Sequence, residues 1–250
     1  MTTHLYCVLP RTERGAVPPG LHGVDGGAVR ALGLDGLVAW VSDVDRGHPV
    51  SIEGIRAHND VVDVAMETGS TPVPVRFGQR FGDDHACRMA LSGRAASIER
   101  LLATMQGFVE MTVIITPSTS RMVDDLEPLL PEMFDSEAAG AGRRYLDTLR
   151  KREARTGAIH QATDATAGEI SAAAMSFVHQ TLEHQTTTPM PLRTISHLIS
   201  RDDIDAYRAA LSQARGAPGL RFLVIGPRAP YSFCALGDEA GGPHGMNLAG

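Results

Sequence analysis

The stretch TPVPVRFGQRF, residues 71–81, decides how the first half of the chain is interpreted. Its apolar side chains occupy every second position, a period that predicts a β-strand: Val73, Val75 and Phe77. Pro72 and Pro74 have no backbone N–H to donate, so we expect this strand to lie at a sheet edge. If the alternation holds, Arg76 points to the opposite face from Phe77. A solvated arginine on a strand and an arginine in an interaction surface both fit this pattern.

The composition fits one large or two small domains with a packed core. The chain has 250 residues, of which 43% are hydrophobic, and its formal net charge is -6. This charge argues against a nucleic-acid-binding protein that relies on a general positive field.

The cysteines and the N-terminus point to a cytoplasmic protein. Cys7, Cys87 and Cys234 are far apart and form no CxxC pair, so we expect free thiols rather than a zinc site. The first residues, MTTHLYCVLP, do not resemble a signal peptide. No apolar run approaches the roughly 20 residues that a membrane span needs. We therefore expect a soluble protein without a membrane partner.

The first half of the chain predicts an α+β domain over residues 1–117. Strands are expected at 4–9, at 37–42 around Trp40, at 108–116, and around Val24 and Val29. Ser51 is a good N-cap for a helix whose apolar stripe is Ile52, Ile55, Asn59, Val62 and Met66, with one amide in it. Asp83 and Asp84 start a second helix whose stripe is Leu91, Ala95, Ile98, Leu102 and Met105. We expect both helices to cover one face of a mainly antiparallel sheet.

The second half predicts another α+β domain, over residues 118–236, with a helical insertion at 137–185 and a flexible tail at 237–250. Helices are expected at 137–155 and 166–185, followed by a proline-marked edge strand within 186–200. Asp202 caps a further helix, and LRFLVI at 220–225 is a clear strand. Helices alternating with strands in this way suggest a modified ferredoxin-like fold with an antiparallel sheet.

One dense basic patch lies on the helix expected at 137–155: Arg143, Arg144, Arg150, Lys151, Arg152 and Arg155. A solvated helix face is the simpler interpretation, and an anion or partner site is the alternative. Tyr145, the aromatic residue of this segment, belongs to the apolar stripe with Leu146 and Leu149 and not to the basic patch, so we do not expect the patch to bind nucleic acid.

Residues that could carry catalysis are scattered, and we assign no catalytic, cofactor-binding or metal-binding residue. His179 and His184 are five positions apart, so they do not share a helix face as a metal pair would. Neither a GxSxG element nor a phosphate-binding Walker A loop occurs. For an enzyme, the best pair that the sequence offers is His58 with Arg76.

Several segments occur in an order that resembles the gas vesicle protein F/L family: HLYCVL, LHGVDG, LVAWVSDV, SIEGIRAHNDVVDVAM, TPVPVRFGQRF, GFVEMTVII and GPRAPYSF. The resemblance covers about residues 4–236. It implies two α+β domains, the second ferredoxin-like, and an accessory protein of gas vesicle assembly without enzymatic activity. It also implies a minor vesicle component or chaperone-like factor that binds the small apolar shell protein and other gas vesicle proteins.

The closing element departs from that family. Arg228 stands where the family usually has tryptophan, and Ala229 stands where it has proline. We expect partner contacts in the stretch at 71–81 and in this closing element: Val73, Val75, Arg76, Phe77, Phe81, Arg228, Tyr231 and Phe233.

A physical reason supports such an accessory protein. Subunits of a shell that excludes water expose apolar surface and strand edges before assembly, and would otherwise aggregate. A partner with proline-marked edge strands can pair with them on one side without extending the ribbon. The alternatives are a small-molecule enzyme and a metabolite-sensing module on ferredoxin-like domains.

Overall fold

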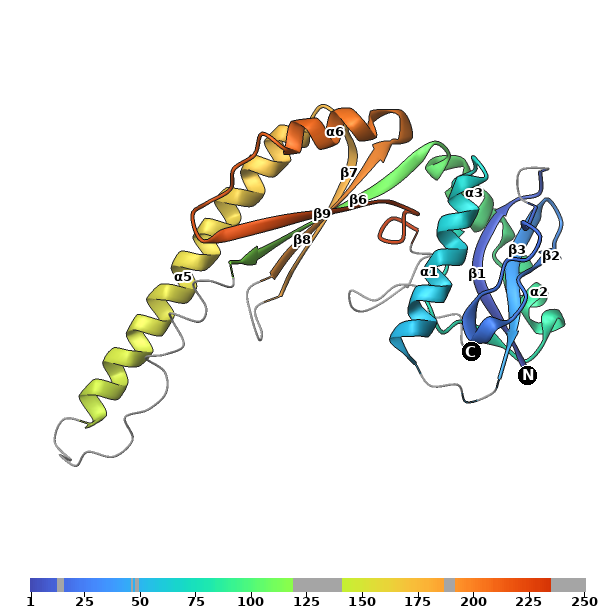
Figure 1. Cartoon of the computed structure of the whole chain (residues 1–250), viewed down its shortest axis with the longest axis horizontal. Helices are drawn as coiled ribbons and strands as arrows, with labels where there is room; N and C mark the ends of the chain where they lie inside the picture. The colour runs from blue at the N-terminus through green and yellow to red at the C-terminus, as the bar shows by residue number, and fades with distance from the viewer. Residues whose placement is uncertain (13–15, 46, 48–49, 119–140, 187–191, 235–250) are drawn as a thin grey trace. The chain divides into compact units, whose positions relative to one another are not determined.

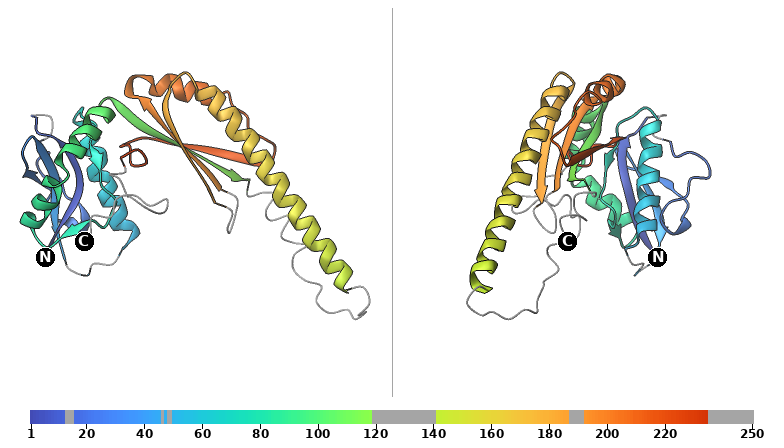
Figure 2. Two further views of the ribbon diagram at one scale, coloured as in Figure 1. Left: turned by 180° about the vertical axis from the view of Figure 1, so that it is seen from behind. Right: turned by 60° about the vertical axis from the view of Figure 1, so that its left-hand side comes forward.

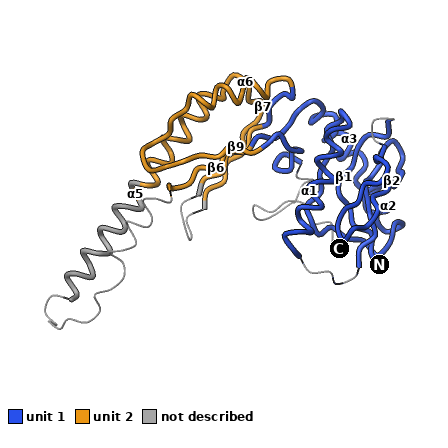
Figure 3. The backbone as a smooth tube through the Cα atoms, in the orientation of Figure 1, with its two compact units in different colours: residues 1–111, 198–201, 226–250 blue, residues 112–197, 202–225 orange. Residues whose placement is uncertain are grey.

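The computed structural model describes residues 1–12, 16–45, 47, 50–118, 141–186 and 192–234. The side chains at 141–156, 158, 186 and 192 are not described, so the predicted basic patch lies outside the described side chains, as does the predicted tail at 237–250. Two compact units are present (Figure 3). Unit 1 comprises residues 1–111, 198–201 and 226–250, and unit 2 comprises residues 112–197 and 202–225.

The first sheet is built around a central strand, β1 (Figure 1). Its strands are β1 (Thr2–Pro10), β2 (Arg30–Gly33), β3 (Leu37–Val44), β4 (Val73–Pro74) and β5 (Arg80–Phe81). The strand order is β2-β3-β1-β4, and β5 also pairs with β1. Every pairing in this sheet is antiparallel. Val24 lies in a short 3-10 turn, η2 (Val24–Gly26), rather than in a strand.

Helices cover both faces of this sheet, which corrects the expectation that they share one face. The helices are α1 (Ile52–Glu67), α2 (Asp84–Ser92) and α3 (Ala95–Met105). Side chains of α2 and α3 join one core cluster with Leu5 and Val8 of β1. His58 of α1 instead contacts His4 and Tyr6, which alternate with Leu5 along β1. Figure 2 shows α1 and α3 on opposite sides of the sheet. Trp40 of β3 is fully buried.

The predicted edge strand at 73–77 is confirmed as an edge but is shorter than expected. Only Val73 and Pro74 are assigned to β4, which is the last strand in the order. The backbone N–H of Val75 still donates to the carbonyl oxygen of Tyr6 at 2.9 Å. The chain then leaves β1 and returns at β5, where Phe81 pairs with Thr3.

The starts of α1 and α2 were predicted correctly, but the buried face of α1 was not. The helix predicted after Asp83 is divided at Gly93 into α2 and α3, and the N-cap of α6 is Asp203 rather than Asp202. The Ser51 side chain accepts from the N–H of Gly54, and Asp83 accepts from that of Ala86, as N-caps do. The buried residues of α1 are Gly54, His58, Val61, Val62, Ala65 and Met66. Ile52 and Ile55 are 65% and 38% exposed. The helix is therefore rotated so that a histidine, rather than two isoleucines, faces the sheet.

The second sheet has the strand order β7-β8-β6-β9. Its elements along the chain are β6 (Phe108–Pro117), α5 (Ala141–Ala174), β7 (Val178–Thr186), β8 (Leu192–Ser200), η4 (Arg201–Asp203), α6 (Ile204–Leu211) and β9 (Leu220–Arg228). Strand, helix, strand, strand, helix, strand with this order is the ferredoxin-like arrangement. The predicted antiparallel, ferredoxin-like second half is confirmed.

Three assignments in this region were wrong. The proline-marked strand within 186–200 was expected at a sheet edge, but β8 lies between β7 and β6. Residues 178–185 were predicted as helix, but they form β7, because pairing with β8 overrides the local pattern. The strand at 108–117 was expected to close the first sheet, but β6 lies inside the second sheet. β9 also continues to Arg228, beyond the predicted break at Gly226.

The connection before β9 is fixed to α5 by side chains that accept backbone N–H groups. The carboxylate of Glu169 accepts from Arg215 and Gly216 at 2.9 and 3.1 Å, and Oγ1 of Thr166 accepts from Ala217 at 2.9 Å. These bonds attach residues 215–217, just before β9, to α5 and so help to position the start of β9.

Substituting Gly23 tests the packing around Tyr6. A Cβ at Gly23 would lie 2.1 Å from the Tyr6 hydroxyl, which accepts from the N–H of Val24. Gly23→Ala therefore displaces that hydroxyl, and we expect it to lower the free energy of unfolding by about 1–3 kcal/mol. Gly33→Ala is the control, because no atom lies within 4 Å of its Cβ. Urea unfolding followed by Trp40 fluorescence measures both; equal midpoints would contradict the assigned packing.

Candidate functional site

The stretch at 75–79 forms a short excursion away from β1. Before it, Val75 bonds to Tyr6; after it, the N–H of Leu5 donates to the carbonyl oxygen of Gln79 at 3.1 Å. Arg76 is exposed and Phe77 is half-buried. Arg76 is thus exposed, but the predicted alternation does not extend to Phe77. Val75 joins the core cluster with side chains of α2 and α3, whereas Phe77 contacts His4 and His58 on the side of α1. Both ends of the excursion are hydrogen-bonded to the central strand.

The two valines of this stretch are buried, whereas residues that contact a partner are expected to be accessible. Val73 and Val75 are 0% exposed and belong to the core cluster of unit 1. Side chains of α2 and α3 belong to the same cluster and help to enclose them. Among the other predicted contacts of this stretch, Arg76 is exposed, and Phe77 and Phe81 are half-buried.

Phe77 covers a pair of buried histidines. Its ring centroid lies 5.6 Å from that of His4 and 5.8 Å from that of His58. It also lies against the first turn of α1, where a Cβ added at Gly54 would be 3.2 Å from the Phe77 ring. Gly54 thus leaves room for the ring that closes the histidine pair off from solvent.

Hydrogen bonding fixes the protonation of the histidine pair. Nε2 of His58 lies 2.8 Å from the carbonyl oxygen of Val75, which can only accept, so Nε2 carries the proton. Nδ1 of a neutral His58 then accepts from Nε2 of His4 at 2.9 Å. Nδ1 of His4 is buried without a partner among the described residues, as an unprotonated nitrogen. Both nitrogens of His58 are therefore used in holding the fold.

Burial keeps both histidines neutral. It lowers the pKa of His4 to about 3, with further lowering by His58 and Arg80, and it lowers the pKa of His58 to about 4. When the pH falls below 6.5, the ordinary pKa of histidine, these two histidines bind protons in the unfolded chain but not in the folded protein.

The closing element is anchored on unit 1 by a buried carboxylate. Glu110 accepts from the N–H of Ser232 at 2.8 Å and from its hydroxyl at 2.6 Å. The hydroxyl of Tyr231 donates to Oδ1 of Asn59 at 3.3 Å, and burial raises the pKa of Tyr231. Phe233 packs against the core cluster, to which Cys234 belongs. These residues hold the end of the chain in place.

Arg228 is the exposed member of the closing element among the predicted partner residues. Burial raises the pKa of Asp63 on α1, and the positive charge of Arg228 partly offsets this rise. The predicted residues therefore divide into three groups: Val73 and Val75 are buried, Phe77, Phe81, Tyr231 and Phe233 are half-buried, and Arg76 and Arg228 are exposed.

Sequence reasoning missed an exposed apolar group at the start of α1. Val50 and Ile52 are 73% and 65% exposed, and Ile55 is 38% exposed. Phe77 lies against Gly54. Arg76 and Ile55 are the residues next to these two in the sequence. Glu110 was also missed; a single carboxylate within the apolar strand FVEMTVII was the signal that a buried acceptor needed donors.

Among the described residues, no group of three or more His, Cys, Asp or Glu side chains is placed to hold a metal ion. No helix in that part of the chain is long and apolar enough to cross a membrane.

Comparison with known proteins identifies the family. The family model described as gas vesicle synthesis protein GvpL/GvpF matches residues 2–235. The chain belongs to the GvpL/GvpF family. Its role is therefore related to gas vesicles, and the family is not known for enzymes.

Relatives and solved structures agree over nearly the whole chain. Gas vesicle protein L1 of Halobacterium salinarum is 23% identical, with 92% of this chain and 89% of the relative covered. Gas vesicle protein L of a Streptomyces species is 25% identical, with 94% of each covered. The crystal structure of GvpF from Anabaena sp. PCC7120 matches the fold with a TM-score of 0.68 at 18% identity, covering 96% of this chain and 99% of that one. GvpF from Microcystis aeruginosa gives the same TM-score and identity, with 94% and 99% covered.

Because the pKa values of His4 and His58 are lowered, we expect the protein to lose stability as the pH falls. Since the folded pKa values lie below 6.5, stability from each histidine is complete above about pH 6.5 and falls towards pH 4. The loss is up to about 1.4 kcal/mol per pH unit for each histidine. His58→Gln can still donate to Val75 and accept from His4, and should remove about half of this slope.

Urea unfolding of unit 1, followed by Trp40 fluorescence between about pH 7 and pH 5, measures that slope. His22→Gln is the matched control, because His22 is exposed and should leave the slope unchanged. A slope that His58→Gln leaves intact would show that other groups cause the acid sensitivity.

Removing the Glu110 carboxylate should release the closing element. Glu110→Ala leaves both donors of Ser232 without their acceptor, and we expect unit 1 to lose about 1.5–3 kcal/mol of stability. Amide exchange at Ser232 should become faster, while exchange in β3 stays the same. Glu99→Ala, at an exposed position on α3, is the control. Unchanged exchange at Ser232 in Glu110→Ala would contradict the anchoring role.

Proposed function

We propose that this protein is an accessory factor of gas vesicle assembly that binds the small apolar shell protein and other gas vesicle proteins. It acts in the cytoplasm and at the vesicle, as a minor vesicle component or as a chaperone-like factor, without catalysing a reaction. The observation that carries this proposal is the family match over residues 2–235. The gas vesicle names of the relatives support it.

The chemistry of the shell gives such a factor its task. A wall that excludes water requires subunits with large apolar faces, and these faces aggregate when they are exposed in water. A binding partner lowers the concentration of free subunits and delivers them to the growing shell. Binding of this kind needs an accessible apolar surface rather than a catalytic pocket.

Unit 1 offers a surface of this kind at the start of α1. Ile52 and Ile55 are exposed there, and the ring of Phe77, the residue after Arg76, lies against Gly54 in the same turn of the helix. This group, which we name the α1 surface, combines apolar side chains with one cation. Exposed aliphatic and aromatic side chains beside an arginine are the usual anchors of protein interfaces.

The state of the reactive side chains supports a role without catalysis. Both nitrogens of His58 are committed to hydrogen bonds, so the predicted His58–Arg76 pair lacks a free base. Burial raises the pKa of Cys87 and Cys234 to about 12, and it raises that of Cys7 as well. These thiols therefore stay protonated near neutral pH and are poor nucleophiles.

The test is aggregation of the shell protein, followed by light scattering after dilution from denaturant. We expect an equimolar amount of this chain to suppress the scattering. Ile55→Lys with Arg76→Glu should weaken the suppression several-fold, because it places charge in the apolar group and reverses the cation. Both residues are exposed, so the variant should remain folded.

Met89→Lys is the matched control, since Met89 is an exposed apolar side chain on α2. It should suppress scattering as well as the unmodified chain does. Absence of suppression by the unmodified chain would overturn binding of the shell protein. Equal suppression by all three proteins would remove the α1 surface and leave the function itself standing.

A further inference from the structure

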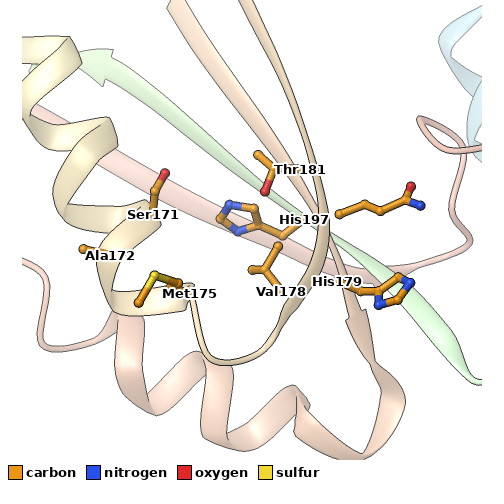
Figure 4. Close-up of a pocket in the computed structure, with 8 residues that line it drawn as sticks. Ser171, Ala172, Met175, Val178, His179, Thr181 and His197 are labelled. Atoms are coloured by element: carbon orange, nitrogen blue, oxygen red, sulfur yellow. The ribbon is translucent and has the colours of Figure 1, made fainter.

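A pocket in unit 2 lies between the C-terminal end of α5 and the strands β7 and β8 (Figure 4). Its volume is about 420 Å³, which is within the size range of small-molecule sites. Its lining includes the apolar residues Met175 and Val178, the hydroxyl-bearing residues Ser171 and Thr181, and His197 of β8. The pocket therefore offers a ligand both apolar contact and hydrogen-bonding groups.

His197 is held in place by Tyr207 of α6. It is 1% exposed, and its Nδ1 lies 2.8 Å from the Tyr207 hydroxyl. Burial lowers the pKa of His197 to about 4 and raises the pKa of Tyr207, so both side chains are uncharged near pH 7. A neutral imidazole has one nitrogen that donates a hydrogen bond and one that accepts.

The Tyr207 hydroxyl determines which nitrogen of His197 carries the proton. This hydroxyl is buried, and His197 is its one hydrogen-bond partner among the described residues. If Nδ1 donated to it, the hydroxyl proton would be left without an acceptor, which is unfavourable in a buried site. Tyr207 therefore donates to Nδ1, and Nε2 carries the proton of the ring.

The N–H at Nε2 is the donor that a ligand would meet. It forms no hydrogen bond with the described residues, although His197 is almost fully buried. Nδ1 is directed at α6, and Figure 4 shows the ring between Ser171 on α5 and Thr181 on β7. Because a buried donor without an acceptor is unfavourable, an acceptor atom of a ligand is favoured at this position.

The charges nearby favour an uncharged acceptor over an anion. The negative charge of Glu183 on β7 acts on His197 and would repel an anion bound beside it. The cation of Arg193 is engaged by Glu183 and Asp164. Among the described residues that line the pocket, none is Asp, Glu, Lys or Arg. A carboxylate or phosphate would lose its hydration there without gaining a cation, whereas a carbonyl oxygen needs only an N–H.

The rest of the lining fits a flat ring. Met175, directly after α5, is 76% exposed, and a thioether packs well against the atoms of an aromatic ring. The hydroxyl groups of Ser171 and Thr181 can donate or accept, so either can accept from an N–H of the ligand. A heterocycle that carries a carbonyl group next to an N–H, which is a lactam, matches both the donor at His197 and these hydroxyl groups.

We propose that this pocket binds a small uncharged heterocycle with a lactam group, of the kind found in pyrimidine bases. The lactam carbonyl oxygen accepts from Nε2 of His197, the adjacent N–H donates to the hydroxyl of Thr181, and the ring packs against Met175. The site goes beyond the proposed function, because it belongs to unit 2 and takes a small molecule rather than a protein.

The experiment is an NMR titration of the full chain at pH 7, with thymine as the probe and the backbone amide signals of residues 178–181 as the readout. We expect saturable shifts with a Kd below about 1 mM. The control ligand is 5-carboxyuracil, which has the same ring and lactam groups but a carboxylate in place of the methyl group. It should bind at least about tenfold more weakly.

His197→Asn tests the donor directly. The amide oxygen of asparagine takes the place of Nδ1 and still accepts from Tyr207, but the N–H at Nε2 is lost. We expect thymine to bind at least about fivefold more weakly to this variant. His184→Asn is the matched control, because His184 is exposed on β7 and does not line the pocket. It should change the affinity by less than about twofold.

Thr181→Val removes a hydroxyl group at an exposed position without changing the size of the side chain, so it tests the site even if His197→Asn does not fold. It should weaken thymine binding about threefold or more. The amide spectrum away from the pocket shows whether each variant is folded.

Any of three results would overturn the proposal. The first is the absence of saturable shifts at residues 178–181 with thymine at up to about 10 mM. The second is binding of 5-carboxyuracil that is as tight as binding of thymine, which would contradict selection of an uncharged ligand. The third is unchanged thymine affinity in the folded Thr181→Val and His197→Asn variants, which would place the ligand elsewhere.

Discussion

The backbone of Val75 joins three parts of unit 1. Its N–H donates to Tyr6 on β1, and its carbonyl oxygen accepts from His58 on α1. His58 in turn accepts from His4, so the helix is joined to the central strand directly through His4 and indirectly through Val75. Leaving that buried carbonyl without a donor would cost about 1–3 kcal/mol. The excursion that carries Arg76 and Phe77 starts at this point, and its position depends on these bonds.

Much of the fold follows from local signals in the sequence. Ser51 and Asp83 begin helices because each has a side-chain oxygen that accepts an N–H three residues later. The apolar run at 108–116 is a strand, and the order of elements in the second half gives a ferredoxin-like sheet. The segment at 178–185 was misassigned because its strand pairing involves residues distant along the chain, which local periodicity does not encode.

Less of the candidate site could be predicted from the sequence. Alternation at 73–77 predicts which side chains share a face, but it does not say whether both faces are covered. The core cluster with α2 and α3 buries Val73 and Val75, whereas Ile52 and Ile55, which look like core residues, are exposed. His58 takes the inward position because its two nitrogens satisfy a carbonyl and a second histidine. Such pairing depends on residues distant along the chain, which local periodicity does not encode.

Unit 1 thus carries a surface suited to an apolar partner, the exposed isoleucines at the start of α1. Hydrogen–deuterium exchange of the full chain, with and without the shell protein, tests most directly whether the protein works by binding that partner. The account predicts slower exchange in the first turn of α1, with β3 unchanged. Unchanged exchange throughout both units, at saturating shell protein, would contradict it.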